Sequence, residues 1–117
     1  MTATVELCRH LCLDSAGTMG PSEEVTQAVA VGDANAAQLE VVMFALTATT
    51  VTFTLQESNS PLEGWKDKDA GLTVSDIGRS LLAAKTSVAV GYVRIKCEVT
   101  AGTGKAIFAA TLHLSSQ

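Results

Sequence analysis

Apolar and polar side chains alternate with a period of two along most of this chain. Residues 50–58 alternate Val51, Phe53 and Leu55 with threonine and glutamine, and residues 88–100 repeat the pattern. A period of two indicates a β-strand that buries one face and exposes the other. We therefore predict strands at both segments. Four further segments share the alternation or carry a longer apolar run, and we predict them as strands too: residues 2–13, 23–31, 38–47 and 105–114.

Short segments between these strands carry turn residues. Residues 48–49 are short enough to join two strands as a hairpin. Residues 72–84 are ambiguous: they predict a strand followed by irregular chain or a short helix capped by Asp76, which Gly78 would weaken. The spacing predicts an all-β fold, an antiparallel β-sandwich or jelly roll of about seven or eight strands with at most one short helix.

The length of 117 residues fits one ordinary domain. We expect residues 1–22 to form an N-terminal arm, or an edge strand plus a loop, and residues 23–117 to form a single β-sandwich domain. A charged share of 17% and a hydrophobic share of 47% argue against disorder and against a coiled coil. A surface this poor in charge suggests that partners cover part of it.

Residues 38–47 differ from the other predicted strands because apolar side chains occupy both alternating sets. This pattern is typical of a central strand or of one covered on both faces. The three phenylalanines, Phe44, Phe53 and Phe108, all occupy positions that we predict to face the core.

Charge is unevenly distributed along the chain, which has a net charge of −4 and a pI near 5.0. Residues 1–65 hold eight acids and one base, whereas residues 66–117 hold seven bases and four acids. The split would favour assembly if the two halves formed separate surfaces, and would mean nothing if they mixed over one surface. The acidic balance makes nucleic acid an unexpected partner.

Cys8, His10 and Cys12 are the residues that most suggest a metal site. Zinc prefers four tetrahedral ligands, but on one face of a strand these three would spread over about 13 Å, and a second ligand pair is missing. We therefore predict no metal. Three cysteines are too few and odd in number for a disulfide scaffold, so we expect a reducing compartment.

Catalytic sets are also missing from the sequence. His10 and His113 are the only histidines, and no G-x-S-x-G elbow is present. Residues 102–105 (GTGK) lack the spacing of a phosphate loop and precede a strand pattern, so we predict a turn there. We predict no catalytic residue, no cofactor and no enzyme activity.

The chain shows neither an export signal nor a membrane-spanning run. Residues 1–13 lack a basic segment followed by a long apolar one, and no window approaches 18 apolar residues. We expect synthesis in the cytoplasm and no membrane partner.

Two stretches resemble known β-sandwich proteins. Leu55-Gln56-x-Ser58-Asn59 precedes Trp65, and Tyr92-Val93-Arg94-Ile95 begins a later strand. This pairing resembles the discoidin-like jelly-roll pattern. The chain is also similar to small β-sandwich virion proteins of tailed bacteriophages, such as capsid decoration (cement) proteins. The likeness covers residues 39–99.

These motif residues suit structural roles. Trp65 can cover one end of the sandwich, and Arg94 can reach over it or pair with an acid. Tyr92 can anchor the strand at the rim, and Ser58 and Asn59 can close a turn.

The likeness to virion proteins implies a non-enzymatic structural protein that decorates or cements a bacteriophage capsid. The major capsid protein or another virion protein would then be its partner, and we expect a homo-oligomer located in the virion and made in the host cytoplasm. The alternative is a discoidin-like module that binds a carbohydrate or another ligand. Such modules display exposed aromatic rings, whereas the motif already uses Trp65 and Tyr92, and Asn59 replaces the usual acid.

Overall fold

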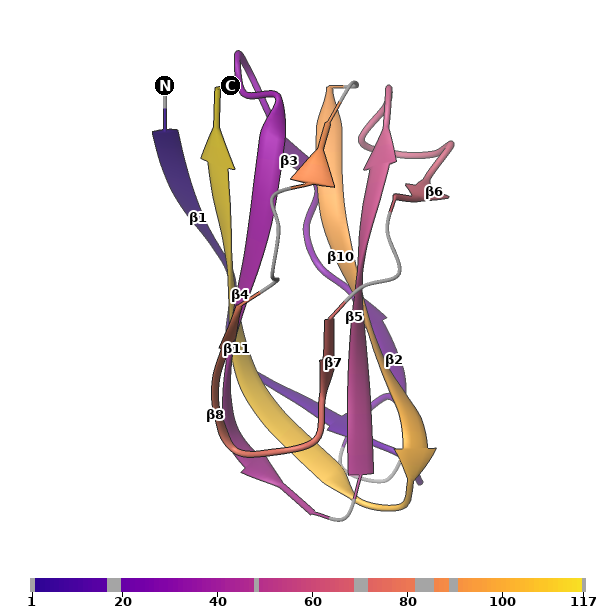
Figure 1. Ribbon diagram of the computed structural model, residues 1–117. Helices are drawn as coiled ribbons and strands as arrows, with labels where there is room; N and C mark the ends of the chain where they lie inside the picture. The colour runs from indigo at the N-terminus through magenta and orange to yellow at the C-terminus, as the bar shows by residue number, and fades with distance from the viewer. Residues whose placement is uncertain are drawn as a thin grey trace.

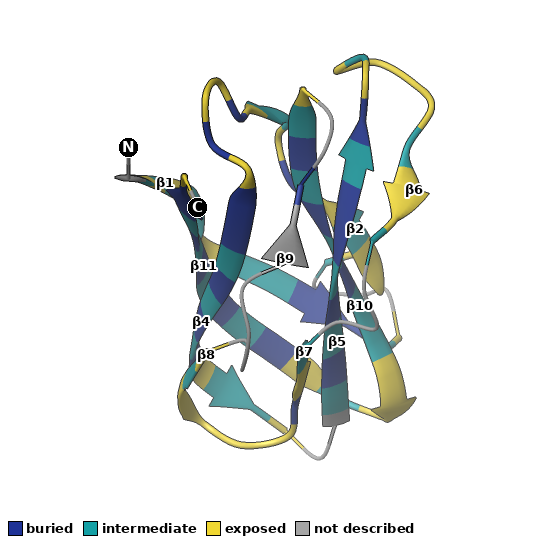
Figure 2. Ribbon diagram, turned by 45° about the horizontal axis from the view of Figure 1, so that its top comes forward, coloured by how far each residue is buried: buried dark blue, intermediate teal, exposed yellow. Residues whose placement is uncertain are grey.

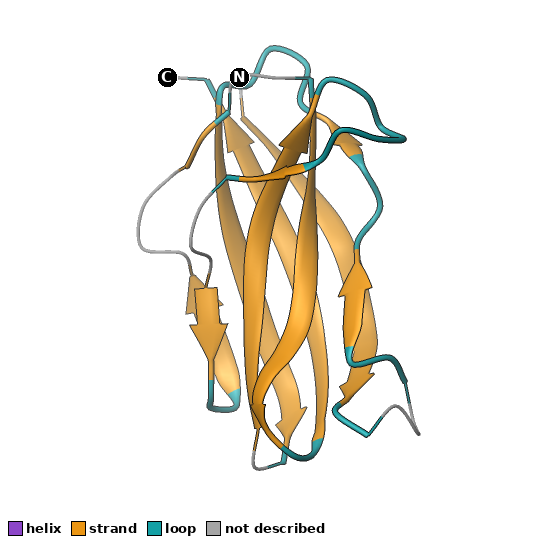
Figure 3. Cartoon of the chain, turned by 90° about the vertical axis from the view of Figure 1, so that its right-hand side faces the viewer, coloured by secondary structure: helices purple, strands orange, loops and turns teal. Residues whose placement is uncertain are grey.

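The computed structural model describes residues 2–16, 20–47, 49–68, 72–81, 86–88 and 91–116. Strands are the only regular elements in these residues (Figure 3), and no helix of the length and hydropathy that a membrane span requires is present among them. The strands in chain order are β1 (Thr2–Asp14), β2 (Glu23–Val25), β3 (Val29–Ala30), β4 (Ala36–Leu46), β5 (Thr49–Ser58), β6 (Lys66–Asp67), β7 (Leu72–Val74), β8 (Gly78–Leu81), β9 (Thr86–Ser87), β10 (Tyr92–Gly102) and β11 (Lys105–Ser115).

The strands form two antiparallel sheets that face each other (Figure 1). Sheet A has the order β1-β11-β4-β8, with β9 also paired to β4. Sheet B has the order β2-β10-β5-β6, with β3 on β10 and β7 on β5. The predicted all-β antiparallel sandwich is confirmed. Its strands outnumber the prediction because six short strands of two to four residues line the long ones.

The predicted hairpin between β4 and β5 is wrong. The two strands are consecutive in the chain but belong to different sheets. Each strand already has hydrogen-bonded neighbours, because β4 pairs with β11, β8 and β9, whereas β5 pairs with β10, β6 and β7. Both must bury an apolar face, so the short connection passes from one layer to the other. Ala48 of this connection lies outside the described residues.

The core lies between the two sheets, and buried residues alternate with less buried ones along the long strands (Figure 2). Phe53 of β5 and Phe108 of β11 are fully buried and meet edge to face, with ring centroids 4.8 Å apart. Such a pair contributes about 0.5–1.5 kcal/mol beyond the burial of its area. The predicted inward positions of Phe53 and Phe108 are confirmed.

The predicted core position of Phe44 is wrong, because 46% of this side chain is exposed. The register between β11 and β4 slips next to it: Ile107 pairs with Ala45, whereas Phe108 pairs with Met43. Phe44 is therefore the extra residue of a β-bulge, which changes the direction of the side chain relative to simple alternation. Met43 occupies the core instead.

The single predicted strand over residues 23–31 is divided into β2 and β3. Thr26, which separates them, is buried, and its hydroxyl takes the place of a strand carbonyl as the acceptor for a backbone N–H of β10. Its N–H donates to Ile95 O at 2.9 Å, and Ile95 N–H donates to the Thr26 hydroxyl oxygen at 2.9 Å. A buried N–H requires such an acceptor, and the threonine interrupts the strand while satisfying it.

The short helix considered for residues 72–84 is absent from their described part. β7 and β8 occupy residues 72–74 and 78–81, and β8 pairs with β4 from Glu40 to Met43. Without β8, this edge of β4 would keep unpaired backbone N–H and C=O groups. A strand can pair with these groups, whereas a helix of one turn cannot. Residues 82–84 lie outside the described residues.

The acidic and basic halves of the chain do not form separate surfaces. β11, from the basic half, lies between β1 and β4, and β10 lies between β2 and β5. Ion pairs consequently cross the halves, as Glu40 with Arg79 and Glu57 with Lys68 show. Of the two interpretations of the charge split, the structure supports mixing.

Candidate functional site

A stacked ring pair on the outer face of sheet A is the most distinctive surface feature of the described chain. His10 of β1 and Phe44 of β4 stack with ring centroids 5.0 Å apart and planes inclined by 29°. The two strands are not neighbours, because β11 lies between them. Ala109 of β11 lies between the two strands at this level, and its small side chain leaves room for the two rings to meet above it.

Irregular pairing on both sides of β11 brings these rings together. On β1, Cys8 pairs with Ala110 and Leu11 with Phe108, so Arg9 and His10 together oppose Ala109. On β4, Phe44 is itself a bulged residue. Bulges re-aim side chains at the cost of ladder hydrogen bonds. Two of them converge on one pair of exposed rings.

Further apolar side chains surround this pair. Ile77 is 66% exposed and directly precedes Gly78, which pairs with Met43 beside Phe44. Val42 and Ile107 are half-buried on the same outer face. We call this surface the ring patch; it comprises His10, Val42, Phe44, Ile77, Leu81 and Ile107.

A polar network crosses sheet A beside the ring patch. Glu40 of β4 bonds to Arg79 of β8 on one side and to His113 of β11 on the other, where Nε2 lies 2.8 Å from Oε1. The opposite ring nitrogen, Nδ1, is 3.3 Å from the Thr4 hydroxyl of β1. The hydrogen bonds from Arg79 and then from His113 hold the pKa of the Glu40 carboxyl below its ordinary value. The network thereby ties together four strands of one sheet.

The order hydroxyl, imidazole, carboxylate is also that of a nucleophilic triad. Because a carboxylate only accepts, His113 Nε2–H donates to Glu40, while Nδ1 lies within hydrogen-bond distance of the Thr4 hydroxyl. Acyl transfer needs, in addition, a substrate cavity and oxyanion donors. These three side chains lie on an open sheet face, and none of them lines the pocket described below. We interpret the arrangement as cross-strand bonding.

The structure separates the residues of the Cys–His segment. Cys8 packs against the core, whereas His10 is exposed in the ring patch, so the expectation that they share one strand face is wrong. The bulges in β1 are the reason. Burial raises the pKa of both Cys8 and Cys97, which disfavours the thiolate that binds metal. Within the described residues, no group of three His, Cys, Asp or Glu side chains is placed to hold an ion.

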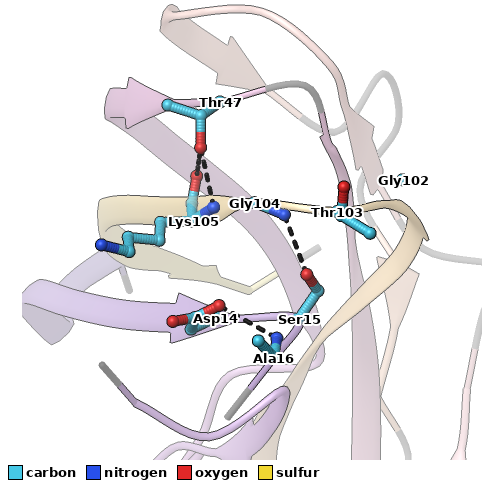
Figure 4. Close-up of a pocket in the computed structure, with 8 residues that line it drawn as sticks. All are labelled: Asp14, Ser15, Ala16, Thr47, Gly102, Thr103, Gly104 and Lys105. Carbon is cyan, nitrogen blue, oxygen red and sulfur yellow. Dashed lines mark hydrogen bonds between the residues drawn. The ribbon is translucent and has the colours of Figure 1, made fainter. Parts of the chain in front are cut away.

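A pocket of about 660 Å³ opens at the end of the sandwich opposite the chain termini (Figure 4). The buried Asp14 carboxylate accepts a hydrogen bond from Ala16 N–H at 3.0 Å. Ser15 Oγ accepts from Gly104 N–H at 2.8 Å, and Thr47 Oγ1 accepts from Lys105 N–H at 2.9 Å. These hydrogen bonds join neighbouring loops to one another. They indicate that the polar groups of the pocket have a structural role at this end of the sandwich.

Residues 102–105 form the turn that the sequence predicts, and this turn joins β10 in sheet B to β11 in sheet A. Gly104 has a φ of +147°, and a Cβ atom there would lie 1.7 Å from Thr47 O. The glycine is required by this close approach of two chain segments.

Three of the residues that carry the resemblance, Gln56, Trp65 and Arg94, meet on the outer face of sheet B. Arg94 lies over the Trp65 ring, 4.3 Å from its centroid, as expected. Arg94 Nε donates to Gln56 Oε1 at 2.8 Å, and Gln56 Nε2 donates to Asp67 Oδ1 at 2.8 Å. The motif therefore joins β10, β5 and β6 and covers the indole ring with a guanidinium.

The loop before Trp65 is held by Ser58, which confirms the turn expected for that residue. Its hydroxyl donates to Glu63 O and accepts from Ser60 N–H at 3.1 Å. Ser60 Oγ in turn accepts from Leu62 N–H at 3.2 Å. These bonds stabilise the loop from within.

Sequence reasoning missed the ring patch and the Glu40 network. Apolar residues on both sides of residues 38–47 were the available signal, but the bulge that exposes Phe44 has no clear mark in the sequence. No protein-family model, curated protein or solved structure matches this chain.

Proposed function

We propose that this protein is a non-enzymatic structural component of a bacteriophage virion that decorates or cements the capsid through protein–protein contacts. Its partner would be the major capsid protein or another virion protein, with assembly as a homo-oligomer. It would be made in the host cytoplasm and function in the virion.

The observation that carries this proposal is the uncovered second face of β4. The inward side chains Leu39, Val41 and Met43 build the core, while Val42 and Phe44 point to the outer face of sheet A. The sequence pattern of residues 38–47 is typical of a central strand or of one covered on both faces, and β4 is central in sheet A. A partner over the outer face of sheet A would cover Val42 and Phe44 as well.

The arrangement of polar groups adds support. The hydrogen bonds described at the pocket, at Glu40 and at Gln56 all join strands or loops of this chain. A rigid sandwich with a long continuous core suits a protein whose role is to hold a shape. The resemblance to capsid decoration proteins points to the same class.

The alternative, a discoidin-like carbohydrate-binding module, needs an open ring for a sugar to stack on. Trp65 is the motif residue that would serve, and Arg94 already lies over its ring. Titration with monosaccharides and oligosaccharides while Trp65 fluorescence is recorded tests this alternative. A saturable change in emission would favour the carbohydrate function over the capsid function.

Sedimentation of a lysate of the native source through a sucrose gradient tests the proposal. The chain is quantified in each fraction by mass spectrometry. Co-migration with a fast particle, at a fixed ratio to a capsid protein, is the expected result. A position near that of a free 12.1 kDa chain, or of a small oligomer without a particle, contradicts it.

A further inference from the structure

The strands that border the two sheets differ in length. Sheet B is bordered by β2 and β3 on one side and by β6 and β7 on the other, and each of these has only two or three residues. Sheet A has the short strands β8 and β9 beside β4, but its other border is β1, with 13 residues (Figure 1). Among the described strands, β1 pairs only with β11. Very short strands protect a sheet edge, whereas a long edge strand offers a row of backbone groups to another chain.

Hydrogen bonds at the start of β11 show which of its backbone groups face β1. Gly104 O accepts from Ser15 N–H on the β1 side, at 3.0 Å. Lys105 O accepts from Thr47 N–H on the β4 side, also at 3.0 Å. Consecutive residues of a strand direct their N–H and C=O groups to opposite edges. The even-numbered residues of β11 therefore face β1.

This alternation determines which groups of β1 point away from the sheet. The register partners of Ala3 and Val5 are even-numbered residues of β11, so Ala3 and Val5 direct their N–H and C=O groups toward β11. Thr2, Thr4 and Glu6 consequently direct theirs outward. No described strand pairs with β1 on that side.

The other end of β1 shows the same alternation, but there the chain covers its own edge. Asp14 N–H points outward and donates to Pro21 O at 3.0 Å. Gly20 passes so close that a Cβ atom on it would lie 2.5 Å from Cys12 O. The edge of β1 is thus closed at residues 12–14 and open at residues 2–6.

We propose that the open edge of β1 pairs antiparallel with the same edge of a second copy of this chain, about a two-fold axis at Thr4. The pairing joins two copies of sheet A into one continuous sheet. This inference deepens the proposed function, because it assigns the contact by which the protein forms a homo-oligomer.

The outward groups select the position of the axis. With the axis at Thr4, the two Thr4 residues exchange N–H···O bonds, and Thr2 of each copy exchanges them with Glu6 of the other. All the outward backbone groups of residues 2–6 are then paired. An axis at Glu6 would place two glutamates directly opposite each other, which is unfavourable. An axis at Thr2 would leave Thr4 and Glu6 without partners in β1.

The side chains of the open edge also match in this register. Ala3 and Val5 pack against the core but are only half-buried. The axis at Thr4 places Ala3 of one copy beside Val5 of the other on the same face, so that each covers the other. Glu6 opposes a threonine, and its ion pair with Arg9 stays intact. The edge is therefore complementary to itself in hydrogen bonds, in apolar contact and in charge.

Sedimentation equilibrium of the purified full-length protein tests the pairing without particles. We expect the mass to rise from 12.1 kDa toward twice this value as the concentration increases from about 1 μM to about 1 mM. A monomer at every concentration would overturn the proposal.

Two substitutions at the axis show whether the backbone of β1 makes the contact. Thr4→Pro removes the outward N–H, which the fold of one copy does not use, so an edge strand should tolerate it. Thr4→Val keeps this N–H and the branched shape and loses only the hydroxyl contact with His113. Circular dichroism confirms that both variants fold. We expect proline to raise the dissociation constant of the dimer at least about tenfold and valine to change it less than about threefold. Equal dimerisation of the two variants would contradict the pairing.

Disulfide crosslinking tests the register, and it does so even if the proline variant fails to fold. In a hydrogen-bonded antiparallel pair the Cα atoms are about 5.5 Å apart, which a disulfide can span. Thr4→Cys should therefore link two copies on mild oxidation with oxidised glutathione. Glu6→Cys is the matched control, because the two copies of position 6 lie on opposite sides of the axis.

Peptide mapping separates these links from any formed by the native cysteines. We expect position 4 to link at least about ten times faster than position 6. Equal rates, or a faster reaction at position 6, would overturn the axis at Thr4.

The outcomes separate this inference from the proposed function. A protein that binds particles but stays monomeric when pure contradicts the edge pairing and leaves the capsid function standing. A protein that dimerises through Thr4 but never sediments with particles contradicts the capsid function and leaves the edge pairing standing.

Discussion

Two ring pairs in this protein have similar centroid distances but lie in opposite surroundings, one edge to face in the core and one stacked on the surface. Phe53 and Phe108 meet at 4.8 Å between the sheets and are fully buried, whereas His10 and Phe44 meet at 5.0 Å on the outer face of sheet A. The buried pair follows the regular alternation of its strands. The exposed pair depends on two slips in register. The comparison indicates that regular pattern builds the fold, while its interruptions shape the surface.

The largest effect should come from the buried pair. Phe108→Ala leaves a cavity in the core and should lower the free energy of unfolding by about 3–5 kcal/mol. Phe44→Ala, the matched change in the exposed pair, should cost less than about 1 kcal/mol. Urea denaturation followed by circular dichroism measures both. Similar costs for the two variants would remove the distinction between the pairs.

Threonine offers the same comparison between buried and exposed sites. Thr26→Val leaves the buried Ile95 N–H without its acceptor and should cost about 1–3 kcal/mol. Thr52→Val breaks a hydroxyl contact with Thr100 on the outer face of sheet B and should change stability by less than about 0.5 kcal/mol. Chemical denaturation provides the measurement.

A matched control separates the hydroxyl of Thr26 from its shape. Thr26→Ser keeps the acceptor for Ile95 N–H and removes one methyl group, so it should recover most of the loss seen with valine. A serine variant as unstable as the valine variant would show that packing, and not the hydrogen bond, determines the cost.

The outer face of sheet B should show an intermediate effect at Arg94. Arg94→Ala removes the contact over Trp65 and the bond to Gln56, which together should contribute about 1–2 kcal/mol. Arg94→Lys keeps the charge near the ring and should lose less. Thermal unfolding measures stability, and a red shift of Trp65 emission in the alanine variant would report the uncovered ring. Unchanged emission would contradict the stacked geometry.

The smallest expected effect is a loss of stability at low pH. The pKa of Glu40 is lower in the folded chain than its ordinary value of 4.5. A carboxyl with a depressed pKa contributes stability above its unfolded value, and this contribution is lost as pH falls through the folded pKa. Stability should therefore drop below about pH 4.5, and Glu40→Gln should reduce the slope. Arg79→Gln, which removes the main cause of the shift, should reduce it as well.

The sequence predicted the parts of the fold that depend on alternation. Val93, Ile95 and Cys97 point inward as their spacing indicates, and the all-β sandwich follows from such segments. It did not predict which strands pair. The connection between β4 and β5 looked like a hairpin because short loops usually join neighbours, yet both strands pair with partners far along the chain.

The candidate site was less predictable for the same physical reason. A bulge depends on how two strands slip past each other, so Phe44 carried no local sign of its exposure. The Glu40–His113 contact needs β11 beside β4, which only the assembled sheet provides. The Arg94–Trp65 contact was predictable because the family resemblance relates these two residues to each other. The alternation of apolar and polar residues does not say which residues of different strands meet.

The central claim is that the buried pair serves the fold, whereas the outer face of β4 that carries Phe44 serves the proposed contact with a virion partner. The most direct test measures the unfolding free energy and the particle-binding isotherm of Phe44→Asp in one preparation, beside the wild type. We predict a stability change below about 1 kcal/mol and a loss of binding of at least about tenfold. Binding equal to that of the wild type, with the fold intact, would contradict the claim.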